Sequence, residues 1–388
     1  MPPGRARGPR VTGAGGTTSG PEGGSPVVDR APYMRWSKLH ERATHDLTGS
    51  NLHPVTLDEL PGATGALALH GPNDEGYAPL LEAIATRYGV TPDRVCTATG
   101  TSGANFLAMA ALLRPGDAVL VERPAYDPLL GAARLLGAEV RRFERRFEEA
   151  WQPDPDRIGK LLTNGVRLVV LTNLHNPSGV RIRDEALDEI ARRAERVGAR
   201  VLVDEVYLEA AFAAAPRPAA TRSPVFVSTN SLTKTWGLAG LRAGWALAAP
   251  EVAEAMRRVR DVVDAVGSFP SDALATVAFA HLDALEERAR AILGPNAARL
   301  AEVLDGAAAV EWVRPEGGPV AFPRLLGTDT AEPFVRRALA DYGVGLVPGH
   351  FFEAPAHFRV AVGGDPRRVR PALDRLADAL GTWPGRPA

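Results

Sequence analysis

The stretches Arg167-Leu-Val-Val-Leu-Thr172 and Arg200-Val-Leu-Val-Asp-Glu205 decide the fold of this 388-residue chain. Short apolar runs of the same kind stand at 119–122, 224–229 and 244–249, and helical patterns fill most of the gaps between them. Strands with continuous apolar residues are buried on both faces, and helical crossovers connect parallel strands. The sequence therefore predicts an α/β fold in which helices cover both faces of a mainly parallel sheet.

The pattern changes on either side of this region. Residues 1–30 hold eight Gly and five Pro, too little apolar area to offset the conformational entropy of folding. A helical face at 77–88 stops at Gly89, and after Pro270 a long Ala-rich helical pattern leads into short strand-like segments. The predicted division is a disordered tail at 1–30, an N-terminal segment that packs on the smaller domain at 31–60, a large domain at 61–270 and a smaller α+β domain at 271–388.

Composition narrows the class of function. The chain has 45 basic and 46 acidic side chains, and no block of five like charges, so it lacks the clustered Lys and Arg that bind nucleic acid or anionic membranes. No run approaches the ~18 apolar residues of a membrane-spanning helix. The one cysteine, Cys96, lies in an apolar run and is expected to be a small buried hydrophobe. We expect a cytoplasmic protein that acts on small molecules without a metal.

Lys234 stands in the segment Asn230-Ser-Leu-Thr-Lys-Thr-Trp-Gly237, which follows an apolar run. A lone lysine is usually a solvated surface residue, but the end of a strand is where α/β sheets bind ligands. The hydroxyls of Ser231 and Thr233 lie beside it, and Arg242 follows eight residues later. A guanidinium binds phosphate oxygens through two hydrogen bonds, so this segment favours a phosphate ligand.

A second phosphate-binding segment is predicted at Thr97-Ala-Thr-Gly-Thr-Ser-Gly103. It reads as a strand end, a glycine turn and a helix that opens near Ser102, so free backbone N–H groups would face an anion there, with Thr101 and Ser102 as donors. A plain helix cap is the simpler interpretation of this segment alone. A serine-hydrolase elbow requires G-x-S-x-G, and here Gly103 follows Ser102 directly.

Four other residues stand in segments that can be interpreted in two ways. Asn176 belongs to Asn-Pro-Ser-Gly, which alone predicts a turn, and Tyr126 could simply pack beside its neighbouring proline. Asp204 ends an apolar strand, where a carboxylate is costly to bury without a partner, and Tyr207 follows three residues later. An anion beside a protonated pyridine nitrogen would be such a partner.

Taken in order from Gly76 to Gly364, these segments resemble the class I/II aminotransferases, which are fold-type-I enzymes that use pyridoxal 5'-phosphate. The resemblance implies a seven-stranded sheet and an aldimine between the cofactor and Lys234. It also implies that Tyr126 lies against the pyridine face, Asp204 at the ring nitrogen, and Asn176 and Tyr207 at the phenolic oxygen. The phosphate is assigned to Thr101, Ser102, Ser231 and Arg242.

The resemblance extends to the substrate. Arg359, in His-Phe-Arg-Val-Ala-Val-Gly-Gly, occupies the place of the family's arginine for the substrate α-carboxylate, and Gly49 and Asn51 are candidates for substrate contacts. A homodimer is implied. Many members have a tyrosine that reaches the phosphate of the neighbouring subunit, and this chain offers His70 or Tyr77 near that position.

Transamination between an α-amino acid and a 2-oxo acid is the function that the resemblance favours. β-Elimination, decarboxylation, racemisation and oxidation begin with the same cofactor and stay open, because a fold does not fix a reaction. A non-enzymatic effector-binding domain is less favoured, because Lys234 and Asp204 are both present. The sequence does not identify the side chain of the substrate.

Overall fold

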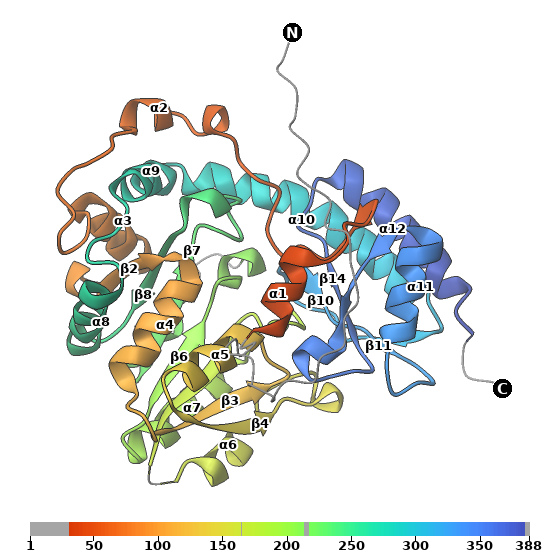
Figure 1. Cartoon of the computed structure of the whole chain (residues 1–388), viewed down its shortest axis with the longest axis horizontal. Coiled ribbons are helices and arrows are strands. Elements are labelled where there is room, and N and C mark those ends of the chain that lie inside the picture. Colours follow the sequence, from red (N-terminus) through yellow and green to blue (C-terminus); the bar gives the residue numbers. More distant parts are fainter. Residues whose placement is uncertain (1–30, 164, 213–216, 385–388) are drawn as a thin grey trace, which may run out of the picture.

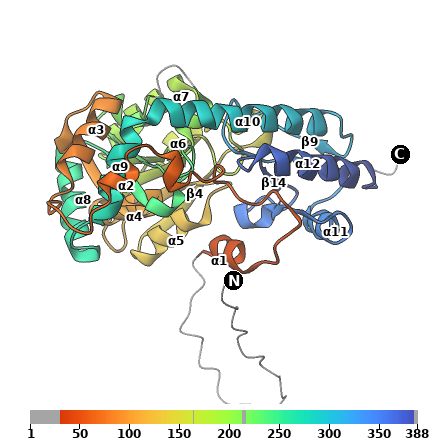
Figure 2. The ribbon, with the colours of Figure 1, turned by 90° about the horizontal axis from the view of Figure 1, so that it is seen from above.

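The computed structural model describes residues 31–163, 165–212 and 217–384 and contains two lobes (Figures 1 and 2). The predicted tail at 1–30 lies outside the described residues. In the larger lobe a hydrophobic core lies on each face of the central sheet, and the core of the smaller lobe lies among the C-terminal elements. Helix α10 (Leu282–Asp305) runs from the first lobe to the second, with Leu285 in the larger core and Ile292 in the smaller one.

The central sheet has seven strands in the order β2-β8-β7-β6-β5-β3-β4. All neighbouring pairs are parallel except the two that involve β8. The predicted α/β architecture with a mainly parallel seven-stranded sheet is therefore confirmed. The strands are β2 (Val95–Thr99), β3 (Ala118–Arg123), β4 (Glu139–Glu144), β5 (Val166–Thr172), β6 (Arg200–Asp204), β7 (Phe226–Ser231) and β8 (Ala243–Leu247).

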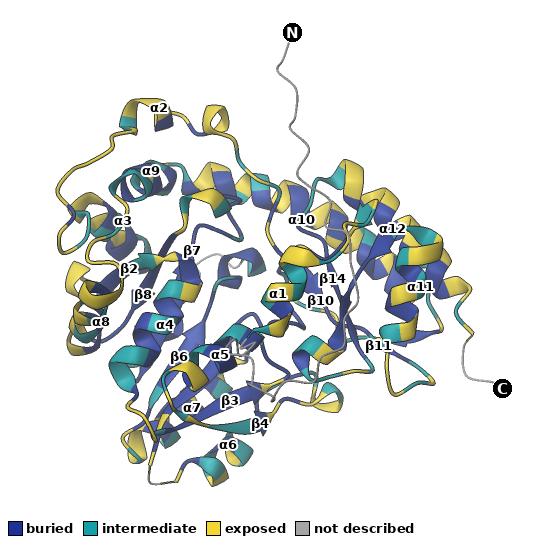
Figure 3. Ribbon diagram, in the orientation of Figure 1, coloured by how far each residue is buried: buried dark blue, intermediate teal, exposed yellow. Residues whose placement is uncertain are grey.

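Helices cover both faces of this sheet because successive strand side chains point to opposite faces. In β5, Val169 and Leu171 join the core that contains α3, α7 and α9, whereas Leu168 and Val170 join the core under α4, α5 and α8. Strands β7 and β8 are accordingly buried along their whole length and β5 and β6 along most of it, whereas β4, at the edge of the sheet, is mostly half-buried or exposed (Figure 3). These helices are α3 (Ala78–Tyr88), α4 (Gly100–Leu112), α5 (Asp127–Leu135), α7 (Asp184–Arg196), α8 (Pro250–Val263) and α9 (Phe269–Ala280), with α6 (Pro155–Leu161) beside α7.

The smaller lobe combines short strands with helices packed on one another. Its three-stranded sheet has the order β10-β14-β13, and α12 packs on α10 and α11. Its elements are β9 (Val310–Glu311), β10 (Val320–Ala321), β11 (Arg324–Leu325), α11 (Glu332–Tyr342), β12 (Val344–Gly345), β13 (Val347–Pro348), β14 (Phe358–Ala361) and α12 (Pro366–Gly381).

The N-terminal segment joins this lobe through β1 (His45–Asp46), which pairs in parallel with β12. Two details differ from the sequence expectations. The segment contains a helix, α1 (Pro32–Leu39), which has only eight residues, too few for a helix to be stable alone, and packs against α5. The predicted helical stretch at 271–304 is broken between α9 and α10, and α9 packs on α3 of the larger lobe. The boundary at 270 stays a prediction.

Candidate active site

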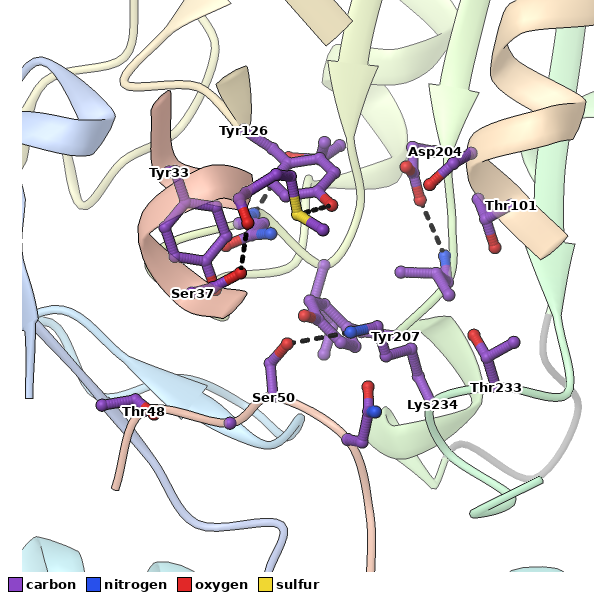
Figure 4. Close-up of a pocket in the computed structure, with 18 of the residues that line it drawn as sticks. Tyr33, Ser37, Thr48, Ser50, Thr101, Tyr126, Asp204, Tyr207, Thr233 and Lys234 are labelled. Carbon is purple, nitrogen blue, oxygen red and sulfur yellow. Dashed lines mark hydrogen bonds between the residues drawn. The ribbon is translucent and has the colours of Figure 1, made fainter. Parts of the chain in front are cut away.

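A cavity of about 340 Å³ opens between the carboxyl ends of the central strands, the N-terminal segment and α1 (Figure 4). Parallel sheets bind their ligands at this edge. Most of the residues that the sequence analysis identifies as site candidates line this cavity. The lining includes Gly49, Asn51, Thr101, Ser102, Tyr126, Asn176, Asp204, Tyr207, Thr233, Lys234 and Arg242.

Lys234 lies in the turn after β7 and points into the cavity. Its Nζ donates a hydrogen bond to Ser50 Oγ at 3.0 Å. Burial, together with the positive charges of Arg359 and Arg242, lowers the pKa of Lys234 to about 7. A substantial part of the amine is therefore neutral, and able to attack a carbonyl group, near neutral pH.

The phosphate end that the sequence predicts is built from hydroxyls at the start of α4 and at the end of β7. Thr101 Oγ1 donates to Ser231 Oγ at 2.7 Å, and Ser231 Oγ lies 2.7 Å from Thr233 Oγ1. Gly100 has a left-handed φ of 69°, and a Cβ there would lie 2.5 Å from Arg242 Nη2. A glycine is thus needed for the arginine to lie across the helix start, where the backbone N–H groups and the guanidinium favour an anion.

Asp204 ends β6 and is held by a buried network. Its Oδ2 accepts from Asn105 Nδ2 at 2.8 Å and its Oδ1 from Val206 N at 3.1 Å. Thr229 Oγ1 in turn donates to Asn105 Oδ1 at 2.6 Å, which fixes the orientation of the amide. Burial raises the pKa of Asp204, while its hydrogen bonds and the charge of Lys234 oppose that shift. A cationic ring nitrogen would stabilise this carboxylate.

Asn176 is held in place by a hydrogen bond to Thr172, which lies at the end of β5. The backbone N–H of Asn176 donates to Thr172 Oγ1 at 3.0 Å. Thr172 itself donates through both its N–H and its hydroxyl to Glu122, whose other oxygen forms an ion pair of 2.9 Å with Arg145. Both members of this pair are buried. The Asn-Pro-Ser-Gly turn is thereby anchored to the sheet.

Two tyrosines form the walls of the cavity. Burial raises the pKa of Tyr207 to about 12 and also raises that of Tyr126, so both phenols are neutral hydrogen-bonding groups near neutral pH. Tyr126 donates to Met34 Sδ on α1 at 3.1 Å. The assigned ring contacts of both tyrosines stay predictions.

Arg359 lies in β14 beside the cavity but is completely buried. Its Nη1 donates to Asn176 Oδ1 at 3.0 Å, and its Nη2 donates to Thr48 O at 3.0 Å and to the hydroxyl of Tyr33. The described residues provide no acidic partner for this guanidinium. Its pairing with a substrate carboxylate stays a prediction.

Three other predicted residues are placed outside the cavity lining. Ser231 is fully buried behind Thr101 and Thr233. His70 is exposed, and Tyr77 packs edge-on against Phe269 at 5.2 Å between ring centroids. Their phosphate contacts therefore remain predictions, and for His70 and Tyr77 these contacts involve a second subunit.

Residues that the sequence interpretation missed complete the site. Ser50, Tyr33, Met34 and Ser37 line the cavity, and Asn105 orients Asp204. Asn105 carried one usable signal, because it is a polar residue one helical turn after Thr101 in an otherwise apolar helix. The others lie in the N-terminal segment, which has no period that could assign a face.

The cavity's chemistry defines a class of protein. An amine with a lowered pKa, an anion-binding helix start and a buried carboxylate match the aldehyde, the phosphate and the pyridine nitrogen of pyridoxal 5'-phosphate. The chain belongs to the family Aminotransferase class I and II, whose profile matches residues 50–376. Its cofactor is pyridoxal 5'-phosphate.

The chain is similar to several known members. It is 33% identical to capreomycidine synthase from Streptomyces vinaceus, over 94% of this chain and 97% of that protein. It is 29% identical to an aspartate aminotransferase from Thermotoga maritima, over 79% and 82%. A PLP-dependent aminotransferase from Streptococcus suis superposes with a TM-score of 0.85 at 27% identity, over 94% and 100%.

Proposed function

We propose that this protein is an aminotransferase that moves an amino group from an α-amino acid to a 2-oxo acid. The observation that carries the proposal is the single cavity in which Lys234, Asp204 and Arg242 meet. When bound, pyridoxal 5'-phosphate supplies an aldehyde that condenses with amines and a ring that accepts electrons. The protein's own groups then bind, orient and move protons.

Each group has a proposed role in the reaction. Lys234 provides the amine for the cofactor and, once released, carries a proton to or from the substrate Cα. Ser50 accepts a hydrogen bond from that amine and keeps it inside the cavity. Asp204, fixed by Asn105, keeps the ring nitrogen protonated. Arg359 binds the substrate α-carboxylate, with Gly49 and Asn51 nearby.

A half-reaction tests the proposal. Holoenzyme is incubated with each of a panel of amino acids and no 2-oxo acid, and products are measured by mass spectrometry. We expect the matching 2-oxo acid to accumulate to one equivalent per subunit and to continue only when an acceptor is added, because an aminotransferase alternates between two forms. Continuous release of ammonia or carbon dioxide without an acceptor would contradict transamination.

The similarity to capreomycidine synthase and, at 28% identity, to a PLP-dependent cyclase of known structure supports a second candidate, a ring-forming reaction on the same cofactor. A cyclase keeps the amino group on its product, so the same assay would yield no 2-oxo acid. A product lighter than the amino acid by one water, or isomeric with it, would favour this candidate. The lyase, decarboxylase, racemase and oxidase reactions are distinguished by the other products of that panel.

We further propose a cytoplasmic homodimer with the domain division given above. Exposed apolar side chains support a covering partner: Leu67 and Leu69 precede Asn73 in the chain, and Asn73 donates a hydrogen bond to Gly267 O, which follows the exposed Val262 of α8 and the exposed Val266. A second copy there would lie beside His70 and Tyr77. In the part of the chain that the structure describes, no helix has the length and apolar character to span a membrane.

A further inference from the structure

We propose that Tyr33 is a positioning residue whose hydroxyl occupies the carboxylate subsite of Arg359, and that a substrate α-carboxylate binds by displacing it. The inference rests on the proposed function, because it concerns the arginine assigned to that carboxylate. It identifies a residue of α1 that controls how tightly the enzyme holds its substrate.

The first observation is that both N–H groups of one Arg359 nitrogen already donate hydrogen bonds. Nη2 of Arg359 carries two N–H groups, and both are engaged, one with Thr48 O and one with the Tyr33 hydroxyl. Bidentate pairing with a carboxylate needs two donors that point the same way. A carboxylate can therefore pair fully with Arg359 only if one of these acceptors leaves.

The second observation decides which acceptor leaves. Thr48 O belongs to a backbone segment fixed by hydrogen bonds from Thr48 N and Oγ1 to Asp46 Oδ1, at 2.8 and 2.6 Å. Tyr33 is a side chain on a short helix, and it lines the cavity, whereas Arg359 does not. A ligand in the cavity therefore meets Tyr33 before Arg359.

The third observation is the charge of the subsite. Arg359 is completely buried, and no acidic side chain among residues 31–163, 165–212 and 217–384 forms an ion pair with it. It lies against the rings of Tyr33 and Phe352, with Cζ 5.0 and 5.1 Å from their centroids. A buried cation without a counter-charge selects an anion, and a charged acceptor binds it more strongly than a neutral phenol.

Displacement of Tyr33 also disturbs its neighbours. The Tyr33 ring is stacked near Trp36 on the same helix, at 6.3 Å between centroids, and Trp36 packs on Phe351 at 5.2 Å. Tyr33 N donates to Asp127 at the start of α5. Movement of Tyr33 should therefore change the environment of Trp36, which provides a fluorescence signal independent of turnover.

The test uses holoenzyme and propionate, a carboxylate without an amine that cannot react with the cofactor. Binding is followed through the fluorescence of Trp36, with Trp36→Phe to identify that signal, and by equilibrium dialysis. Because removal of a neutral hydrogen bond frees the guanidinium, Tyr33→Phe should lower the Kd for propionate by about three- to tenfold. For an accepted amino acid it should lower KM and leave kcat within about twofold.

Two variants keep the result interpretable. Tyr342→Phe removes a hydroxyl that contacts Thr382 on the far side of the smaller lobe, and it should leave the Kd unchanged. Arg359→Gln should abolish propionate binding. If propionate still binds, Arg359 is not the carboxylate site, and that part of the proposed function is wrong. If Arg359→Gln abolishes binding while Tyr33→Phe leaves the Kd unchanged or raises it, the displacement by itself is refuted.

Discussion

The two ends of the cavity, which we propose bind the cofactor and the substrate, are built in different ways. The cofactor end is formed where the strands of the central sheet end and the next helix or turn begins. Asp204, Lys234 and Thr101 all lie at such positions. At the substrate end, Tyr33 and Arg359 come from segments 326 residues apart and meet only through the folded smaller lobe. Both ends are assembled by tertiary packing, but local sequence motifs mark the residues of the first end and not Tyr33 at the second.

This difference predicts different kinetic consequences. Groups at the cofactor end act on the electrons and protons of the reaction, so their loss should lower kcat. Groups at the substrate end act on affinity, so their loss should raise KM. The following variants test that division.

Asp204→Asn should have the largest effect. The amide keeps the size and can keep the bond to Asn105, but it cannot stabilise a protonated ring nitrogen, so kcat should fall by about 100- to 1,000-fold, the usual range for one lost electrostatic group. Steady-state kinetics measure it, with Asp329→Asn, an exposed carboxylate, as the control. A variant that raises KM with kcat intact would break the division between the two ends.

Arg359→Lys should have an intermediate effect of the opposite kind. Lysine keeps the charge but loses the planar pair of donors, so KM for the amino acid should rise about 10- to 100-fold, with a smaller change in kcat. Arg337→Lys, on the surface of the smaller lobe, is a suitable control. A fall in kcat at unchanged KM would place Arg359 in the chemistry instead of in binding.

The smallest expected effect is a change in pH dependence. The pKa of Lys234 is lowered to about 7, so recombination of apoenzyme with the cofactor should speed up as pH rises through about 7 and then level off. Arg359→Gln removes one of the positive charges that lower this pKa, and the midpoint should move to higher pH. Absorbance stopped-flow at pH 6 to 9.5 measures both. A rate that still climbs at pH 9.5 in the wild-type protein would contradict the lowered pKa.

The contrast also explains how much the sequence could predict. Strand ends and helix starts are visible as apolar runs followed by Gly, Ser or Asp, so the sheet, the cavity edge and residues such as Asp204 and Lys234 were predicted correctly in position. Gly100 and Arg242 belong to the same local pattern. The sequence marks these residues through their near neighbours, although the residues themselves meet through distant contacts such as that of Gly100 with Arg242.

The rest could not be predicted, because it depends on contacts between distant segments. Helix α1 has only eight residues and packs against α5, and Ser50 lies in a loop, so nothing local marks Tyr33 or Ser50 as cavity residues. The sequence assigns Arg359 to a carboxylate, but its hydrogen bond to the Tyr33 hydroxyl depends on the packing of α1 beside β14 and has no local signal. The break between α9 and α10 likewise follows from packing of α9 on α3.

The central claim is that Lys234 bears the cofactor, and the chain allows an unusually direct measurement of it. The sequence contains three lysines, Lys38, Lys160 and Lys234, and the first two are exposed. Holoenzyme is reduced with borohydride and digested, and the peptides are mapped by mass spectrometry. The phosphopyridoxyl mass should appear on Lys234 alone, should persist in Lys38→Arg and Lys160→Arg, and should vanish in Lys234→Ala. A modified Lys38 or Lys160, or an adduct retained in Lys234→Ala, would contradict the account.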